Sequence, residues 1–163
     1  MISLSPGQKP IVPTPDYVTA FIDMALPAAG MVKTQWGVPV SVIIAQSAHE
    51  SAWGQRVVRN AYFGIKGRSA SGAGTTFATT EVINGKVVHL KDQFRAYRSY
   101  ADSADDYGRF LNQNARYRSA FSYKNDPLKF VDEIAKAGYA TDPQYAAKLK
   151  SIIIKYGLTR YDR

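Results

Sequence analysis

The amino-acid sequence predicts a mostly helical α+β domain into which one β-hairpin is inserted. Several stretches of the chain carry apolar residues at helical spacing and are bounded by Asp, Pro or Gly, as amphipathic helices are. One stretch instead carries Thr, Val and Ile before an Asn-Gly pair and Val after it, which is typical of a tight β-hairpin. A length of 163 residues and a hydrophobic content of 45% suffice for one domain with a real core.

The first helix is expected to follow a proline-rich arm. Residues 1–15 contain four prolines, which favours an extended arm ahead of a domain at 16–163. Asp16 is expected to cap the helix. Pro27 either ends or kinks it, or the helix continues as far as Thr34. The apolar side of this helix is predicted to consist of Tyr17, Phe21, Met24 and Leu26.

A second helix is predicted from Pro39 to about Trp53. Proline suits the first position of a helix because its missing N–H would have no helical partner there. Gly54 is expected to stop the helix. Residues 54–74 then read as a loop, because Gly and Ser accumulate towards their end. One face of the helix is predicted to consist of Val40, Ile43, Ile44 and Ser47.

The β-hairpin is predicted at about residues 75–97, around the pair Asn84 and Gly85. Asn-Gly is the preferred pair for a type I′ turn, because both central residues need positive φ angles. In a two-residue hairpin with this turn, Glu81 faces Val88 across the two strands. The hairpin would form a small β-lobe beside the helices.

Three further helices are predicted after the hairpin. Ser103 to Asp106 resembles a capping box. Asp126 and Asp142 each precede a proline, which places a capping carboxylate before a favoured first residue. Gly138 and Gly157 are expected to end the last two helices. The predicted inward-facing residues are Tyr107, Phe110 and Leu111, then Leu128, Val131, Ile134 and Ala135, and finally Tyr145, Leu149, Ile152, Ile153 and Tyr156.

The chain is strongly basic, with a formal net charge of +8. Such a surface favours polyanionic partners, namely nucleic acid, an anionic membrane or an anionic cell-wall polymer. The basic residues are scattered and no nucleic-acid-binding signature accompanies them, so we expect no nucleic-acid partner. We also expect no membrane insertion, because no apolar run approaches the roughly 18–20 residues of a membrane span.

The sequence offers no pattern for a metal ion or a cofactor. The absence of cysteine excludes disulfides, thiol nucleophiles and Cys-type zinc sites. His49 and His89 do not form a metal-ligand pattern, because neither is followed by a second ligand four residues on. We therefore expect neither a metal site nor a cofactor.

The most informative stretch runs from Gln46 to Gly54 and is followed by an aromatic, glycine-rich loop. A single acidic residue, Glu50, lies near the end of a helix of otherwise apolar and small residues. Burial beside apolar groups raises the pKa of a carboxyl group, so that it keeps a proton near neutral pH. Aromatic walls also suit a sugar ring, which has apolar C–H faces and a polar rim. The pattern therefore suggests a hydrolase of glycosidic bonds.

Five short motifs follow one another along the chain, at residues 46–54, 60–66, 79–81, 94–97 and 137–143. In this order, with the hairpin between the second and the fourth, they resemble the family 73 glycoside hydrolases. These are bacterial and phage β-N-acetylglucosaminidases of peptidoglycan, and the resemblance covers about residues 16–158. It implies a lysozyme-like fold, in which a helical α-lobe and the small β-lobe flank a long groove.

The resemblance also assigns site residues. Glu50 takes the position of the general acid, Glu81 that of a second carboxylate on the β-lobe, and Tyr139 that of an active-site tyrosine. His49 and Tyr62 depart from the family pattern, but neither change removes a catalytic group. Substrate contacts are expected from Trp53, Asn60, Phe63 and Tyr97. Plain structural roles remain open for three of these: core packing for Trp53 and Phe63, and a turn cap for Asn60.

The reaction implied is hydrolysis of the β-1,4 bond from GlcNAc to MurNAc, as by an endo-β-N-acetylglucosaminidase. Glu50 would protonate the leaving oxygen as an oxocarbenium-like transition state develops. Glu81 would either activate a water, giving inversion, or orient the acetamido oxygen of the substrate, giving retention. One alternative is a lytic transglycosylase, although the Gly-Leu-Met-Gln type of segment usual in those enzymes is absent. A non-enzymatic basic cell-wall-binding module is the least favoured alternative.

The biological setting is an expectation from the chain start and its charge. Residues 1–7 lack the basic and apolar regions of a Sec signal peptide. We therefore expect synthesis in the cytoplasm, export by another route and action on peptidoglycan in the periplasm of a target cell. Two settings fit, an antibacterial toxin of a type VI secretion system, which we favour, and a phage-type endolysin. The first requires a periplasmic immunity protein, and the free protein is expected to be a monomer.

Overall fold

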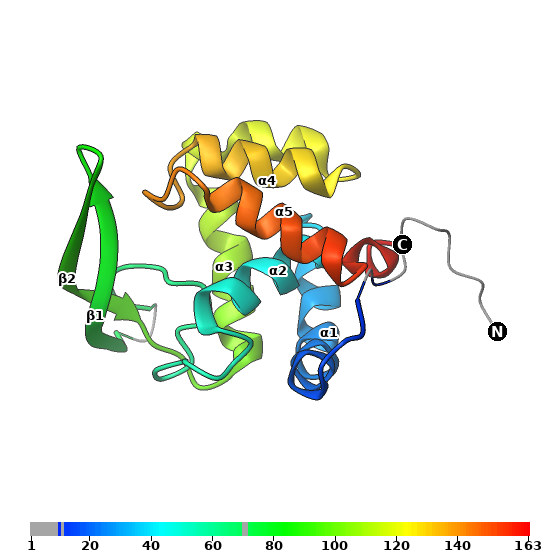
Figure 1. Ribbon diagram of the computed structural model, residues 1–163, viewed down its shortest axis with the longest axis horizontal. Coiled ribbons are helices and arrows are strands. Elements are labelled where there is room, and N and C mark those ends of the chain that lie inside the picture. Colours follow the sequence, from blue (N-terminus) through cyan, green and yellow to red (C-terminus); the bar gives the residue numbers. More distant parts are fainter. Residues whose placement is uncertain (1–9, 11, 70–71) are drawn as a thin grey trace.

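The computed structural model in Figure 1 shows a body of helices with one β-hairpin at its side. It describes residue 10, residues 12–69 and residues 72–163, so the predicted arm lies mostly outside the described residues. The mostly helical fold class with its one small antiparallel sheet is confirmed. The elements are α1 (Asp16–Trp36), α2 (Val40–Ser51), β1 (Gly74–Ile83), β2 (Lys86–Arg95), α3 (Tyr100–Gln113), the 3-10 helix η2 (Ala115–Tyr123), α4 (Pro127–Lys136), α5 (Tyr145–Lys155) and the 3-10 helix η3 (Leu158–Tyr161).

Helix α2 is the central element of the helical body. It packs against α1, α4, α5 and η3. A helix surrounded by others must be apolar or small on every side, and α2 carries no charged residue before its last turn. His49 and Glu50 are its two half-buried residues, and the other residues of the helix are buried. The central helix therefore carries Glu50 to the edge of the core.

Helix α2 ends earlier than predicted. Its last residue is Ser51, and Ala52 and Trp53 follow with φ angles of 50° and 58°. The Ser51 hydroxyl accepts a hydrogen bond from the Gly54 backbone N–H at 2.9 Å. Two non-glycine residues in the left-handed region turn the chain sharply away directly after Glu50.

Helix α1 begins as predicted but buries a different face. Asp16 is its first residue and makes no capping hydrogen bond, because Pro15 occupies the cap position. The helix continues through Pro27 to Trp36. Tyr17 and Met24 are 46% and 42% exposed, so their predicted inward orientation is wrong. The stripe that meets the core consists of Val18, Phe21, Ile22, Ala25, Ala28, Ala29 and Val32.

The hairpin has the predicted turn and register. Asn84 and Gly85 have φ angles of 50° and 76°, as a type I′ turn requires, and Glu81 pairs with Val88. The base of the hairpin joins the loop that follows α2. There the Arg95 N–H donates to the Ile65 carbonyl at 2.8 Å, and the Gly67 N–H donates to the Gln93 carbonyl at 2.8 Å. In Figure 1 the hairpin lies beside the helical body, with its turn at the upper left.

The helix starts in the second half were predicted with mixed success. Asp126 caps α4, accepting from the Lys129 N–H at 3.3 Å, so this prediction is confirmed. Helix α3 begins three residues before the predicted capping box, with Ser99 as its cap, and Ser103 is a buried residue inside it. Asp142 accepts from the Gln144 N–H at 2.8 Å, within a turn that precedes α5. Within the described residues, no helix combines the length and hydropathy needed to cross a membrane.

The close approach of α1 and α3 predicts a stability effect. A Cβ atom at Gly108 would lie 2.5 Å from Cδ1 of Trp36, whereas a Cβ atom at Gly30 would meet nothing within 4 Å. Gly108→Ala is expected to destabilise the fold by about 1–3 kcal/mol through overpacking. Gly30→Ala is the matched control and should be neutral or stabilising by up to about 1 kcal/mol. Urea unfolding measures both, and equal stabilities would contradict the close packing.

Candidate active site

Two cavities meet at Glu50, between the helical body and the hairpin. One has a volume of about 450 Å³ and the other of about 540 Å³. The residues that line both are Glu50, Gly64, Thr79, Thr80 and Phe94. We call the two cavities together the groove. Its walls come from the end of α2, the loop that follows, strands β1 and β2, the end of α3, the η2 segment, the α4–α5 loop and the start of α5. The Glu50 carboxyl group therefore lies partway along the groove rather than at one end.

The Glu50 carboxyl group is tightly enclosed. Tyr145, the first residue of α5, donates its hydroxyl to Oε1 of Glu50 at 3.0 Å. Gly64 has a φ angle of 60°, and a Cβ atom there would lie 2.9 Å from Oε2 of Glu50. Glycine is therefore required at position 64 both by the backbone conformation and by the close approach of the carboxylate.

Burial determines the protonation state of Glu50. The pKa of its carboxyl group is raised to about 7, chiefly by the loss of hydration. The Tyr145 hydrogen bond opposes this rise, and the nearby charge of Glu81 adds to it. The pKa of the neighbouring His49 is lowered, chiefly by burial and then by the charge of Lys148. His49 is therefore mostly neutral near pH 7, and no positive charge on its ring lowers the pKa of Glu50. Much of the Glu50 population consequently carries a proton near neutral pH.

The Glu81 carboxylate has the opposite environment. Thr141 donates its hydroxyl to Oε2 at 2.7 Å, and the Lys66 ammonium lies 2.9 Å from Oε1. These contacts, that of Thr141 first, hold the pKa of Glu81 below its ordinary value. The groove thus holds one carboxyl group that keeps its proton and one that stays ionised, which is the division that acid–base chemistry needs.

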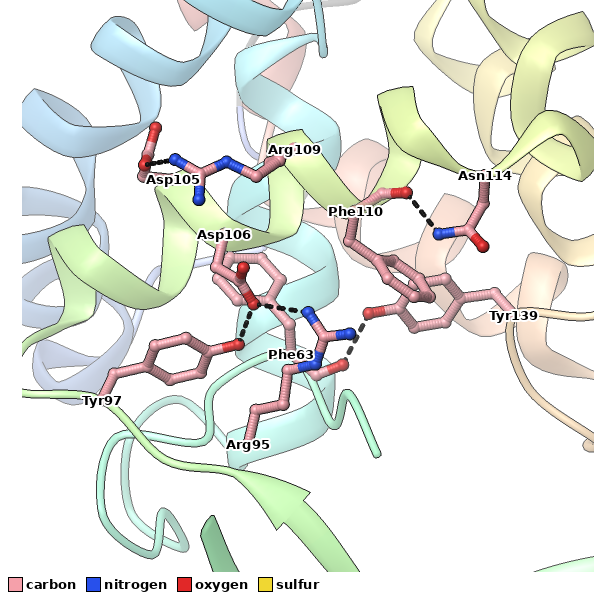
Figure 2. Close-up of polar contacts among 9 residues, drawn as sticks. All are labelled: Phe63, Arg95, Tyr97, Asp105, Asp106, Arg109, Phe110, Asn114 and Tyr139. Atoms are coloured by element: carbon pink, nitrogen blue, oxygen red, sulfur yellow. Dashed lines mark hydrogen bonds and ion pairs between the residues drawn. The ribbon is translucent and has the colours of Figure 1, made fainter. Parts of the chain in front are cut away.

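Tyr139 lines one of the two cavities, beside Tyr145. Figure 2 shows its hydroxyl donating to the backbone carbonyl of Phe63, at 2.6 Å. Its ring stacks on Tyr145, with centroids 5.9 Å apart and an interplanar angle of 9°. Burial raises the pKa of Tyr139 well above its ordinary value, so its hydroxyl is neutral. Tyr139 therefore supports both the ring that contacts Glu50 and the loop that contains Gly64.

Tyr145 is the site residue that sequence reasoning missed. Its place in the inward stripe of α5 predicted burial, which the structure confirms at 2% exposure. A buried tyrosine hydroxyl normally needs a hydrogen-bond partner, and this is the signal that could have pointed to Glu50. The stripe alone does not identify that partner, because Glu50 is 95 residues away in the chain.

The four predicted substrate-binding residues make structural contacts. Trp53 packs edge-on against Tyr156, and the Asn60 amide donates to the Tyr97 carbonyl at 3.1 Å. Phe63 is 1% exposed and stacks on a core tyrosine. The Tyr97 hydroxyl donates to Asp106 of α3, beside Arg95 (Figure 2). None of these four residues lines the two cavities in the described part of the chain. Their contact with substrate therefore stays a prediction.

No cluster of three acidic, histidine or cysteine side chains that could hold a metal ion occurs within residues 10, 12–69 and 72–163. The described groove instead offers carboxyl, hydroxyl and ammonium groups. These groups are suited to acid–base chemistry and to hydrogen bonding of a polar ligand.

Comparison with protein families gives one match over most of the chain. A family model described as Glucosaminidase, mannosyl-glycoprotein endo-beta-N-acetylglucosaminidase, matches residues 26–158. The peptidoglycan hydrolase FlgJ of Vibrio parahaemolyticus is 40% identical over 144 residues, which are 84% of this chain and 47% of that protein. The chain thus spans about half the length of this relative.

Two solved structures show the same fold. A peptidoglycan hydrolase mutant from Sphingomonas sp. A1 is 32% identical, with a TM-score of 0.79 over 87% of this chain and 96% of that chain. A type VI secretion system effector–immunity complex from Pseudomonas protegens has a chain that is 18% identical, with a TM-score of 0.61 over 86% of this chain and 91% of that chain. At that identity the second match shows a shared fold alone.

The burial of Glu50 predicts a pH-dependent stability. Its pKa is raised from 4.5 to about 7, so the folded protein binds more protons than the unfolded chain between these pH values, and stability falls as the pH rises through them. A rise of this size corresponds to a loss of up to about 3 kcal/mol by pH 8. Glu50→Gln is expected to remove this loss.

Urea unfolding of both proteins at pH 5 and pH 8 measures the effect. The free energy of unfolding of Glu50→Gln, relative to the native sequence, should be larger at pH 8 than at pH 5. A difference that is the same at both pH values would mean that Glu50 titrates normally in the folded protein.

Proposed function

Because the chain belongs to the glucosaminidase family, we propose that it hydrolyses the β-1,4 bond from GlcNAc to MurNAc in peptidoglycan, with Glu50 as the general acid. The observation that carries the proposal is the position of Glu50, enclosed and partly protonated where two cavities meet. A glycan lying along both cavities would present a bond inside the chain to this carboxyl group. The proposal is therefore endo-cleavage of a polymer.

The two carboxyl groups suit the two sides of the reaction. Glu50 holds the proton that the leaving oxygen needs as the glycosidic bond breaks. Glu81 is ionised and carries the negative charge that the developing oxocarbenium ion needs. Glu81 either activates a water, giving inversion, or orients the substrate acetamido group, giving retention. The anomer formed first, read by NMR, distinguishes these routes.

The tyrosine pair supports the general acid. Tyr145 gives Glu50 a hydrogen bond that fixes the direction of its carboxyl group, and Tyr139 stacks behind it. When Glu50 becomes ionised after the proton transfer, the Tyr145 hydroxyl stabilises the new charge. Tyr139 contributes through packing and through the Phe63 carbonyl. We therefore assign the smaller catalytic effect to Tyr139.

Glu50→Gln should abolish wall hydrolysis. Loss of a general acid lowers rates by about 10²–10⁴-fold. Glu81→Gln should be strongly impaired and Tyr139→Phe less so. The matched control is Glu133→Gln, which changes the third glutamate of the chain, on α4, and should retain full activity. The measurement is turbidity clearing of purified peptidoglycan, with mass spectrometry of the products.

Product ends separate the proposed reaction from its alternative. Reducing GlcNAc ends support the glucosaminidase, whereas anhydro-MurNAc ends would identify a lytic transglycosylase. A folded Glu50→Gln protein with activity within a few fold of the native sequence would refute the role of Glu50. A native protein that binds peptidoglycan without clearing it would instead favour a wall-binding module without catalysis.

We propose further that the protein is an antibacterial effector that reaches the periplasm of a rival cell through a type VI secretion system. A hydrolase of this kind is harmless in the cytoplasm, which holds no wall, and toxic in the periplasm. A producer would then need a periplasmic immunity protein, and blocking the groove at Glu50 is the simplest inhibition. The net charge of +8 favours an acidic inhibitor, because opposite charge speeds association.

Export of the chain to the periplasm of a naive bacterium should lyse the cells, and export of Glu50→Gln should not. Co-export of the product of the neighbouring gene should protect them, and the protective protein should form a one-to-one complex that covers Glu50. Survival of cells that export active enzyme, or lysis that no neighbouring gene product prevents, would refute the effector role. The phage-type endolysin would then take its place.

A further inference from the structure

The Thr141 hydroxyl makes two hydrogen bonds to strand β1. It accepts from the Val82 backbone N–H at 2.9 Å and donates to Oε2 of Glu81 at 2.7 Å. The first bond fixes the strand and the second fixes the side chain of the preceding residue. Thr141 belongs to the α4–α5 loop, which points towards the hairpin in Figure 1. One hydroxyl group thus connects the helical body both to the strand and to its carboxylate.

This connection lies far from the attachments at the base of the hairpin. Arg95, at the base, bonds to Ile65 and to Asp106, whereas Val82 is paired with Val87, next to the turn. A strand rises about 3.3 Å per residue, so Glu81 is roughly 23 Å along the strand from its start at Gly74. A small tilt at the base would move Glu81 by several times more than it moves Arg95. The Thr141 contact restrains the hairpin at the position of Glu81 itself.

Lys66 is the other partner of Glu81, and it holds the carboxylate less precisely. Its ammonium lies 2.9 Å from Glu81 and 2.8 Å from Asp92, and its side chain is 52% exposed. A long, exposed lysine has many rotamers, whereas threonine is branched at Cβ and has few. Lys66 therefore stabilises the charge of Glu81, whereas Thr141 fixes the orientation of its carboxylate.

We propose that Thr141 is a positioning residue, which holds the Glu81 carboxylate over the groove by joining strand β1 to the α4–α5 loop. The inference rests on the proposed function, in which Glu81 takes part in the reaction. We therefore expect Thr141 to contribute to kcat rather than to binding of the glycan. Misplacement of a reacting group by about 1 Å can cost about 100-fold in rate.

The test compares three threonine variants with the native sequence on purified peptidoglycan or a soluble glycan fragment. Thr141→Val keeps the shape and removes the hydroxyl, and it should lower kcat by about 10–100-fold while KM changes by less than about 3-fold. Thr141→Ser keeps the hydroxyl and should stay within about 3-fold of native kcat. Thr34→Val is the matched control, since Thr34 also uses its hydroxyl in a hydrogen bond, on α1 away from the groove, and should be unchanged.

The pH profile separates positioning from a purely structural role. Glu81 faces Thr141, the Lys66 ammonium, Asp92 on β2 and, across the groove, Glu50 on α2. Loss of the Thr141 hydrogen bond removes the largest influence that lowers the pKa of Glu81. The acidic limb of the kcat profile should therefore move to higher pH in Thr141→Val and remain in place in Thr141→Ser and Thr34→Val.

Two outcomes would overturn the inference: native kcat with an unmoved acidic limb in Thr141→Val, or an equal loss in Thr141→Ser. If Thr141→Val proves unstable in a thermal melt, Thr141→Ala gives the same comparison, because it removes the hydroxyl without placing a second methyl group beside Val82. Failure of the proposed function is distinguishable, since the native protein would then be inactive or Glu50→Gln would be active.

Discussion

The energetic cost of charging a buried carboxyl group at Glu50 is the constraint on which the rest of the site depends. A central helix that is buried on nearly every side delivers Glu50 to the groove, and the chain then turns away through two left-handed residues. Gly64 approaches the carboxyl group so closely that a Cβ atom there would displace it. This enclosure raises the pKa of Glu50 to about 7 and lets a glutamate act as an acid near neutral pH.

The β-hairpin supplies the complementary half of the site. Its base is bonded to the loop after α2, and its far end is bonded to the α4–α5 loop. Glu81 therefore lies between two anchors, with a hydroxyl and an ammonium group that favour its ionised form. The two lobes give two carboxyl groups opposite environments. That difference, rather than either residue alone, makes hydrolysis of a glycosidic bond the function that the groove fits best.

Local sequence patterns predicted the hairpin and the position of Glu50 well. Asn84-Gly85 specifies its turn through backbone conformation alone, so the pairing of Glu81 with Val88 followed. Asp126 before a proline specified a helix start for the same local reason. The prediction of Ser103 as a helix cap was wrong, because Ser99 offers an equivalent cap one turn earlier. The helix then includes Ser103, which is buried within it. Tyr17 and Met24 are exposed because tertiary packing, not apolar character, chooses the buried stripe.

The contacts that orient the site could not be predicted in this way. Tyr145 with Glu50 and Thr141 with Glu81 join residues 95 and 60 positions apart, and periodicity reports burial without naming partners. The aromatic residues of the motifs are predicted to contact substrate. Phe63 instead packs in the core, where it anchors the loop after α2, and Tyr97 bonds to α3, where it anchors the base of the hairpin. An aromatic residue in a motif can serve either purpose, and the sequence alone does not distinguish them.

The most direct test of the account is the pKa of Glu50 itself. Labelling the glutamate side-chain carboxyl carbon with ¹³C gives three signals, since the chain contains three glutamates, and Glu50→Gln identifies the signal of interest. We predict that this signal titrates with a pKa of about 7, well above that of Glu81. A Glu50 signal that titrates at its ordinary value of 4.5 would contradict the central claim.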